Sequence, residues 1–135
     1  MFLLDTNVIS ELRRARPHGA VLNWLKKTAS ENLHIAAVTI GEIQSGIEIT
    51  RDHDPLRAAE LELWLAQVSA TFNVIAMDGE TFRFWAKLMH RSSNDLVNDA
   101  MLAASAKQHG LTIVTRNTKD FRVFGVDLLN PFLET

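Results

Sequence analysis

Cysteine is absent from the 135-residue sequence, and proline and glycine are scarce, with three and six residues. The absence of cysteine excludes disulfide bonds, thiolate metal ligands and a cysteine nucleophile, and it is consistent with a reducing compartment. An excess of charge of one sign is also absent, because 14 lysines and arginines stand against 16 aspartates and glutamates, for a net charge of −2. Overall charge therefore does not indicate a nucleic-acid-binding protein, and any such role must come from local placement of charge.

Long apolar runs are missing as well. No run approaches the roughly 20 residues that span a bilayer, and Asp5 interrupts the apolar N-terminus in a way that does not fit a signal peptide. We therefore expect a cytoplasmic protein with no membrane association. Linkers rich in proline, glycine or serine, internal repeats and low-complexity tracts are also absent, so residues 1–135 are expected to form one domain.

Short apolar runs alternate along the chain with longer stretches of helical periodicity. We expect strands at residues 2–4, 33–37, 74–76 and 112–115, and an edge strand at 126–129 stopped by Pro131. We expect helices at residues 7–13, 20–29, 40–49, 55–70, 79–91 and 96–109. Strands that are apolar on both faces are typical of a parallel sheet covered on both sides. The predicted fold is a three-layer α/β/α domain with a short, mostly parallel central sheet flanked by helices.

Local signals support several of these boundaries. Asp54 precedes Pro55, which is the pattern of an N-cap followed by proline in the first helical turn. Gly110 follows the last helix as a C-terminal stop, and residues 117–125 are expected to form a loop with a short turn. Aromatic side chains recur at helical spacing in 79–91 and 55–72, which favours packing between helices over base stacking.

Four polar residues stand at the ends of the expected elements. Asp5 ends the first strand, and Asn117 lies just beyond the strand at 112–115. Glu42 and Asp99 fall in the expected first turns of two helices. Ligands of open α/β sheets bind in the crevice beyond the carboxyl ends of the strands, so these side chains are expected to line one crevice.

Each acid also has a purely structural interpretation. Thr39 and Glu42 have the spacing of a capping box. Asp5 can cap the first helix, and Asp99 is favoured in a first turn by the helix dipole. Asp95, four residues before Asp99, is interpreted as a helix cap rather than a ligand.

The combination of three carboxylates points beyond capping. Carboxylates that converge to about 4 to 5 Å repel one another by several kcal/mol per pair at an effective dielectric of about 20, so such a cluster needs protons or a cation. Oxygen ligands without cysteine, and without histidines at ligand spacing, favour Mg²⁺ or Mn²⁺ over Zn²⁺. The five histidines are scattered along the chain and are interpreted as surface or structural residues.

Four motifs, in order along the chain, carry a family resemblance. They are Leu4-Asp5-Thr6-Asn7-Val8-Ile9-Ser10-Glu11, Thr39-Ile40-Gly41-Glu42-Ile43, Asn98-Asp99-Ala100-Met101-Leu102-Ala103-Ala104-Ser105-Ala106 and Val114-Thr115-Arg116-Asn117-Thr118-Lys119-Asp120-Phe121. In order and spacing they resemble the motifs of PIN-domain nucleases, and most closely those of the VapC-type and FitB-like toxins of bacterial toxin–antitoxin pairs. The resemblance extends over essentially the whole chain and implies a PIN-like fold.

The resemblance implies a catalytic set. Asp5, Glu42 and Asp99 would be its acids, with Asp5 and Asp99 as ligands of a Mg²⁺ ion for which Mn²⁺ can substitute. Asn117 stands at a fourth catalytic position, where the family commonly has aspartate, so one negative charge is removed there.

Three further residues match family positions around this set. Thr6 and Thr115 match small hydroxyl positions behind the acids. Asp120 matches a fifth acidic position and would support the site through water or hold the loop.

Together with the resemblance, the acidic set leads to the hypothesis that the protein hydrolyses RNA phosphodiester bonds by a metal-activated water, leaving 5′-phosphate and 3′-hydroxyl ends. Glu42 would orient that water or ligate the ion through it. RNA beside an acidic site requires basic residues at the rim. The sequence offers two basic clusters as candidates for RNA contact: Arg13, Arg14 and Arg16, and Lys107, Arg116, Lys119 and Arg122.

The resemblance also implies macromolecular partners. It implies a cognate antitoxin of the VapB type, which inserts a C-terminal segment into the toxin groove, and a homodimer. It implies that operator DNA is bound only through the antitoxin.

Two other functional classes are compatible with parts of the sequence. A strand that ends in aspartate is also found in haloacid-dehalogenase-type phosphatases, but Asn7 stands where they need a second aspartate. A catalytically inactive PIN-like module that binds RNA or protein would be compatible with Asn117, whereas retention of the three acids favours the nuclease.

Overall fold

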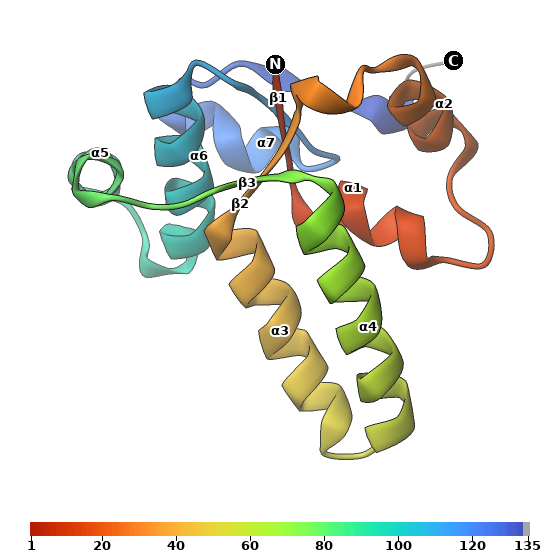
Figure 1. Ribbon diagram of the computed structural model, residues 1–135. Helices are drawn as coiled ribbons and strands as arrows, with labels where there is room; N and C mark the ends of the chain where they lie inside the picture. The colour runs from red at the N-terminus through yellow and green to blue at the C-terminus, as the bar shows by residue number, and fades with distance from the viewer. Residues whose placement is uncertain (134–135) are drawn as a thin grey trace.

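Five short parallel strands form the centre of the molecule in the computed structural model, which describes residues 1–133 (Figure 1). The strands are β1 (Phe2–Leu4), β2 (Leu33–Ala36), β3 (Asn73–Ile75), β4 (Thr112–Val114) and β5 (Leu128–Leu129). Their order across the sheet is β3-β2-β1-β4-β5, and every neighbouring pair is parallel. The sheet is therefore wholly parallel rather than mostly parallel.

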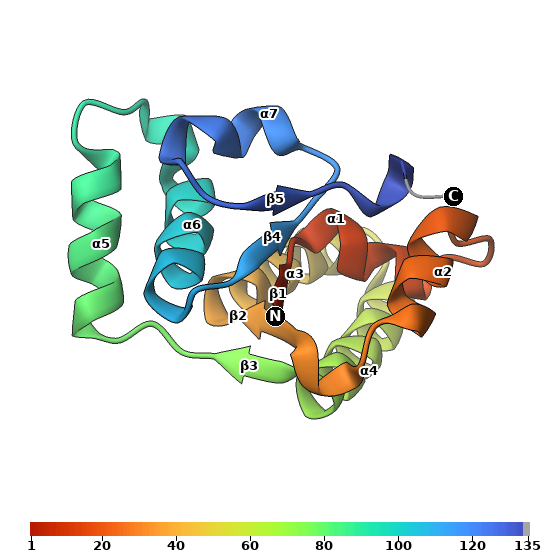
Figure 2. The same ribbon diagram turned by 90° about the horizontal axis from the view of Figure 1, so that it is seen from above.

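Seven α-helices surround this sheet and confirm the predicted three-layer arrangement. They are α1 (Thr6–Ile9), α2 (Gly19–Lys27), α3 (Ala37–Arg51), α4 (Pro55–Thr71), α5 (Gly79–Met89), α6 (Val97–His109) and α7 (Thr118–Phe121). Figure 2 shows α5 and α6 on one face of the sheet and α1 and α2 on the other. Strand residues alternate between two apolar clusters, with Leu3 and Ile113 on the α6 side and Leu4 and Val114 on the α1 side.

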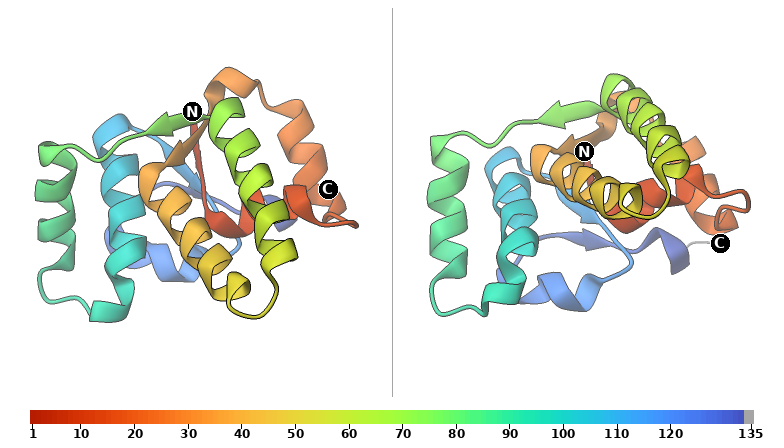
Figure 3. Two further views of the ribbon diagram at one scale, coloured as in Figure 1. Left: turned by 60° about the horizontal axis from the view of Figure 1, so that its bottom comes forward. Right: turned by 90° about the horizontal axis from the view of Figure 1, so that it is seen from below.

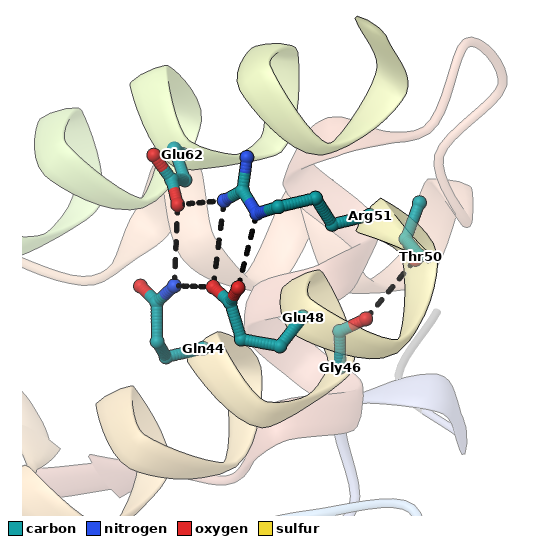
Figure 4. A network of polar contacts seen from close by, with 6 residues as sticks. All are labelled: Gln44, Gly46, Glu48, Thr50, Arg51 and Glu62. Atoms are coloured by element: carbon teal, nitrogen blue, oxygen red, sulfur yellow. Dashed lines mark hydrogen bonds and ion pairs between the residues drawn. The ribbon is translucent and has the colours of Figure 1, made fainter. Parts of the chain in front are cut away.

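Helices α3 and α4 form an antiparallel pair that extends away from the sheet (Figures 1 and 3). Its apolar seam contains Ile47, Ala58 and Leu65. On its exposed side, Figure 4 shows Arg51 bonded to Glu48 and Glu62, with the Gln44 amide donating to the same two carboxylates. These contacts hold the two helices together beyond the edge of the main core.

Several predicted boundaries are confirmed. Asp54 caps α4, because its carboxylate accepts a hydrogen bond from the backbone N–H of Arg57 at 3.1 Å, and Pro55 is the first helical residue. Gly110 ends α6 in the left-handed conformation with φ 64°. Pro131 follows the edge strand β5, and Trp85 of α5 packs against the core as predicted, donating its indole N–H to the carbonyl of Val97 at 3.2 Å.

The first helix is shorter than predicted. α1 ends at Ile9, and Ser10–Arg13 forms a 3₁₀ turn instead of continuing the helix. Glu11 is buried in this turn, where its carboxylate accepts the backbone N–H of His18 at 2.8 Å and pairs with Arg14 at 3.3 Å. A buried acid with these partners ties the following loop back onto the end of the helix.

Other differences concern the starts and ends of elements. β3 is displaced by one residue from the predicted 74–76, and α3 begins at Ala37 rather than at residue 40. Residues 117–125, predicted as a loop, contain α7 and a 3₁₀ turn at Arg122–Phe124, because Phe121 and Phe124 are buried and order this segment against the core. Further 3₁₀ turns lie at Ser30–Asn32, Asn94–Leu96 and Pro131–Leu133. Within residues 1–133, none of the helices has the length and apolar character of a membrane span.

Candidate active site

Asp5 and Thr115 meet at the carboxyl edge of the sheet. β1 and β4 are paired, with Leu4 opposite Val114, so the residues that follow them emerge side by side. The Asp5 backbone N–H donates to the Val114 carbonyl at 3.0 Å. The Thr115 hydroxyl donates to Oδ2 of Asp5 at 2.8 Å. Strand pairing therefore brings together two residues that are 110 positions apart in the chain.

Asp5 is fixed by two further contacts. Its Oδ1 accepts the backbone N–H of Thr6 at 2.8 Å, which makes Asp5 the N-cap of α1, as the sequence allowed. The side-chain amide of Asn7 donates to Oδ2 of Asp5 at 3.3 Å and to the Thr115 hydroxyl at 3.3 Å. The Asp5 carboxylate is thus held by donors on both oxygens.

Asn7 is a site residue that sequence reasoning missed. Besides donating to Asp5 and Thr115, it accepts the backbone N–H of Arg116 at its Oδ1, at 3.1 Å. The signal in the sequence was an amide two residues after Asp5. Although Asn7 belongs to the first motif, the sequence does not assign it a role in the site, because its partner across the sheet becomes visible only after strand pairing.

Glu42 and Asp99 bring two more carboxylates to the same edge. Burial raises the pKa of Glu42, and the charges of Asp5 and Asp99 raise it further, while a hydrogen bond from Asn98 opposes them. Burial, followed by the charges of Asp5, Asp120 and Asp95, raises the pKa of Asp99 to about 6. Asn98 is the second residue missed at the sequence level, although it directly precedes Asp99.

The pKa of Asp5 is raised as well. Burial is the main cause, the hydrogen bonds from Thr115, Thr6 and Asn7 oppose it, and the charge of Asp120 adds to the rise. Asp120 therefore lies near enough to influence both Asp5 and Asp99. The structure brings the acids predicted as a set into one electrostatic unit.

These carboxylates are not neutralised by neighbouring side chains in the described part of the chain. Its ion pairs join Glu11, Glu48, Glu60 and Glu62 to arginines, and none involves Asp5, Glu42, Asp99 or Asp120. Across residues 1–133, no three histidine or carboxylate side chains approach one another closely enough to form a ready-made metal cage. The donors are all oxygen, which is the chemistry that Mg²⁺ and Mn²⁺ prefer, and their unbalanced negative charge fits a cation.

Two capping predictions are wrong. Thr39 lies inside α3, whose N-cap is Ala36, and its buried hydroxyl has no hydrogen-bond partner among the described residues. Glu42 is consequently in the second turn and forms no capping box. Asp95 is exposed in the 3₁₀ turn before α6, whose N-cap position is occupied by Leu96 with no side-chain cap.

The remaining predicted positions lie around the acids. Asn117 is exposed at the rim, and its backbone N–H donates to the Thr115 hydroxyl at 3.0 Å. Thr6 has a buried hydroxyl without a partner in residues 1–133, and it lines a recess of about 330 Å³ together with Glu42 and Arg13.

The basic residues are not equivalent. Arg13 lines the recess beside Glu42, whereas Arg14 is paired with the buried Glu11. A second recess of about 350 Å³ contains Arg116, Lys119 and Arg122 at the same edge of the sheet. Arg16 is exposed in the loop before α2.

Lys107 does not belong with these rim residues. It lines a hollow with Gly110, Leu111, Gly125 and Asp127, which precede β4 and β5 and therefore mark the opposite edge of the sheet. Lys107 and Arg116 are close along the chain and were therefore grouped at the sequence level. Lys107 precedes β4 and Arg116 follows it, so the two residues lie at opposite edges of the sheet.

The chain is thus an α/β/α domain with a parallel sheet, whose carboxyl edge carries acids without ion-pair partners in residues 1–133. The sequence model of the PIN domain family matches residues 2–126, and the chain therefore belongs to this family.

Two curated relatives and one solved structure illustrate the similarity. The chain is 33% identical to "VapC ribonuclease Y4jK" of Sinorhizobium fredii, over 98% of this chain and 98% of the relative. It is 32% identical to "Toxin FitB" of Neisseria gonorrhoeae, over 98% and 99% of the two chains. A solved structure of FitAB bound to an IR36 DNA fragment superposes with a TM-score of 0.85 at 28% identity, covering 100% of this chain and 98% of the other.

Proposed function

We propose that the protein is a metal-dependent endoribonuclease and the toxin of a VapBC-type toxin–antitoxin pair. The observation that carries this proposal is the group of Asp5, Glu42 and Asp99 at one sheet edge, where burial and the charge of neighbouring carboxylates raise the pKa of each. Membership of the PIN family and similarity to a protein named VapC ribonuclease support RNA as the substrate.

Asp5 and Asp99 are the residues that would hold Mg²⁺, or Mn²⁺ in its place. When bound, such an ion lowers the pKa of a coordinated water and offsets charge on the phosphoryl oxygens. Thr115, Thr6 and Asn7 hold the Asp5 carboxylate in one orientation, so that its oxygens need little reorganisation.

Glu42 would orient the attacking water and accept its proton. Its raised pKa makes it a stronger base than an exposed glutamate, which favours its accepting a proton. Attack by water rather than by the ribose 2′-hydroxyl would leave 5′-phosphate and 3′-hydroxyl ends. Asn117 at the rim would hydrogen-bond the substrate or a water without adding charge.

The partners follow from the same relatives. Similarity to a protein named Toxin FitB, and to FitAB solved on DNA, supports a cognate antitoxin of the VapB type. We propose that the toxin inhibits translation and growth until this antitoxin neutralises it, that it forms a homodimer in the cytoplasm, and that it reaches operator DNA only through the antitoxin. We also propose that residues 1–135 act as one domain.

The test is cleavage of a mixed cellular RNA pool by the purified, antitoxin-free protein with Mg²⁺, Mn²⁺ or EDTA. We expect metal-dependent cuts that carry 5′-phosphates when product ends are mapped by sequencing. Asp99→Asn should reduce cleavage by at least about 100-fold, because it removes a metal ligand.

Asp127→Asn is the matched control for this variant. It makes the same chemical change at an exposed position on the opposite edge of the sheet, so it should cleave like the parent protein. Full cleavage by Asp99→Asn, or products ending in 2′,3′-cyclic phosphates, would contradict the mechanism. Metal binding without cleavage would favour an inactive PIN-like binding module.

A further inference from the structure

Arg116 is exposed yet held in place by aromatic stacking. Its guanidinium carbon lies 3.8 Å from the centroid of the Phe132 ring. The Phe132 ring in turn meets His18 edge to face, with centroids 5.1 Å apart. An exposed arginine normally samples many rotamers, whereas this guanidinium has a rigid ring beneath it.

The backbone of Arg116 is also held from both sides. Its N–H donates to Asn7, the residue that contacts Asp5 and Thr115. Its carbonyl accepts the side-chain amide of Asn130 at 3.5 Å, and Oδ1 of Asn130 accepts the backbone N–H of Phe132 at 3.0 Å. The C-terminal turn and the acidic site are therefore connected through Arg116.

This turn, Pro131–Leu133, has its own support. It packs against α2, and the Phe132 side chain contacts the apolar cluster on the α1 side of the sheet. The PIN match ends at residue 126, before this turn begins. Contacts with α2 and with the core therefore support the turn in addition to its contacts with Arg116.

The charge around Arg116 favours a polyanion. Arg116 lines the recess shared with Lys119 and Arg122, beside Asn117 and Asp120. No carboxylate within residues 1–133 forms an ion pair with Arg116. A guanidinium that is stacked on a ring keeps its N–H edge available for two hydrogen bonds to a phosphate.

We infer that Phe132 is a positioning residue that holds Arg116 ready to bind a backbone phosphate of the RNA, next to the phosphate that is cleaved. This inference rests on the proposed function. RNA is favoured over an acidic protein partner because the three cations line the same edge as the acids, where a nucleic-acid backbone must be held against their repulsion.

The first test measures affinity of a labelled, single-stranded RNA of mixed sequence for cleavage-silent Asp99→Asn protein. Loss of the stack frees one rotamer-rich side chain, so Phe132→Ala should weaken binding by about two- to tenfold. In the active protein it should raise KM by a similar factor and leave kcat nearly unchanged. Leu133→Ala, at the neighbouring 77% exposed position, is the matched control and should bind like the parent.

Phe132→Leu guards against a simple folding defect. It keeps apolar contact with the core and removes the aromatic face, so thermal unfolding should be near that of the parent while RNA affinity falls. Arg116→Lys, which keeps the charge and cannot stack as a plane, should lose affinity in the same range.

A double-mutant cycle separates positioning from general damage. If Phe132 acts through Arg116, Phe132→Ala should cause no additional loss of affinity in an Arg116→Ala background. Additive losses of RNA affinity in the double variant would overturn the inference. Unchanged RNA binding by both Arg116→Ala and Phe132→Ala would also overturn it and would favour a protein as the ligand of this face. A parent protein that neither binds nor cleaves RNA would instead overturn the proposed function.

Discussion

At the scale of single residues, the site shows carboxylates that are held in position at an electrostatic cost. Asp5 satisfies a helix terminus and receives hydrogen bonds from Thr115 and Asn7, yet its burial still raises its pKa. Within residues 1–133, Asp99 has no comparable set of donors, and its pKa is raised to about 6 by burial and by neighbouring charge. Such groups are stabilised by a proton or a cation rather than by the protein itself.

The raised pKa of Asp99 predicts a pH-dependent stability. The unfolded chain ionises this group at its ordinary value of 3.8, whereas the folded protein keeps the proton up to about 6. Ionised Asp99 therefore destabilises the fold above about pH 6, and the cost disappears below about pH 4. The full difference corresponds to about 3 kcal/mol, and partial solvent exposure reduces the expected effect to about 1 kcal/mol.

Asp99→Asn should consequently be more stable than the parent in EDTA near neutral pH, and equally stable near pH 4. Urea unfolding at the two pH values measures this difference. Asp127→Asn should show no gain at either pH. Added Mg²⁺ should stabilise the parent more than Asp99→Asn. An equal gain for Asp99→Asn at both pH values would contradict the electrostatic explanation.

At the scale of elements, several helix boundaries differ from those that local sequence signals predict, because tertiary contacts determine where these helices begin and end. α3 begins at Ala37 without a side-chain cap, because Val38, Ile40 and Ile43 pack into the core and stabilise the added turn. α1 is a single turn because the chain continues as a 3₁₀ turn, in which buried Glu11 accepts the backbone N–H of His18 from the following loop. Where a local signal and the core agree, as at Asp54 and Gly110, the predicted boundary is confirmed.

Two glycines in helical contexts should respond oppositely to the same substitution. Gly46 lies inside α3 and a Cβ there meets nothing within 4 Å, so Gly46→Ala should stabilise the protein by about 0.5 to 1 kcal/mol. Gly110 has φ +64°, a left-handed conformation that is strained for alanine, so Gly110→Ala should destabilise the protein by about 1 kcal/mol. Urea unfolding of the two variants measures both signs, and a stabilising Gly110→Ala would contradict the left-handed cap.

At the scale of the whole molecule, a net charge of −2 coexists with an edge where acids and bases lie close together. The acids lie at the ends of β1 and α6 and on α3, and the bases lie in the two recesses beside them. Net charge, which indicated no preference for nucleic acid, is uninformative here because it averages over both edges of the sheet.

The different surroundings of Arg13 and Arg14 predict that arginines of one cluster differ in RNA binding. Arg13→Gln should reduce RNA affinity and lower the slope of log K against log salt by about 0.7, as expected for one lost phosphate contact. Arg14→Gln is the matched control, because Arg14 is paired with Glu11, and it should leave the slope unchanged. Equal effects of the two variants would mean that only total charge matters.

The sequence by itself determined the layered α/β architecture, the order of most elements and the residues Asp5, Glu42 and Asp99 as one group. These follow from periodicity and from acids at element ends, which are local properties of the chain. The tertiary structure alone decided that Asn7 and Asn98 join the site, that Arg14 and Lys107 are separate from it, and that Phe132 stacks on Arg116. The reason is physical: strand pairing and core packing bring together residues far apart in the chain, and no local pattern records which of them will meet.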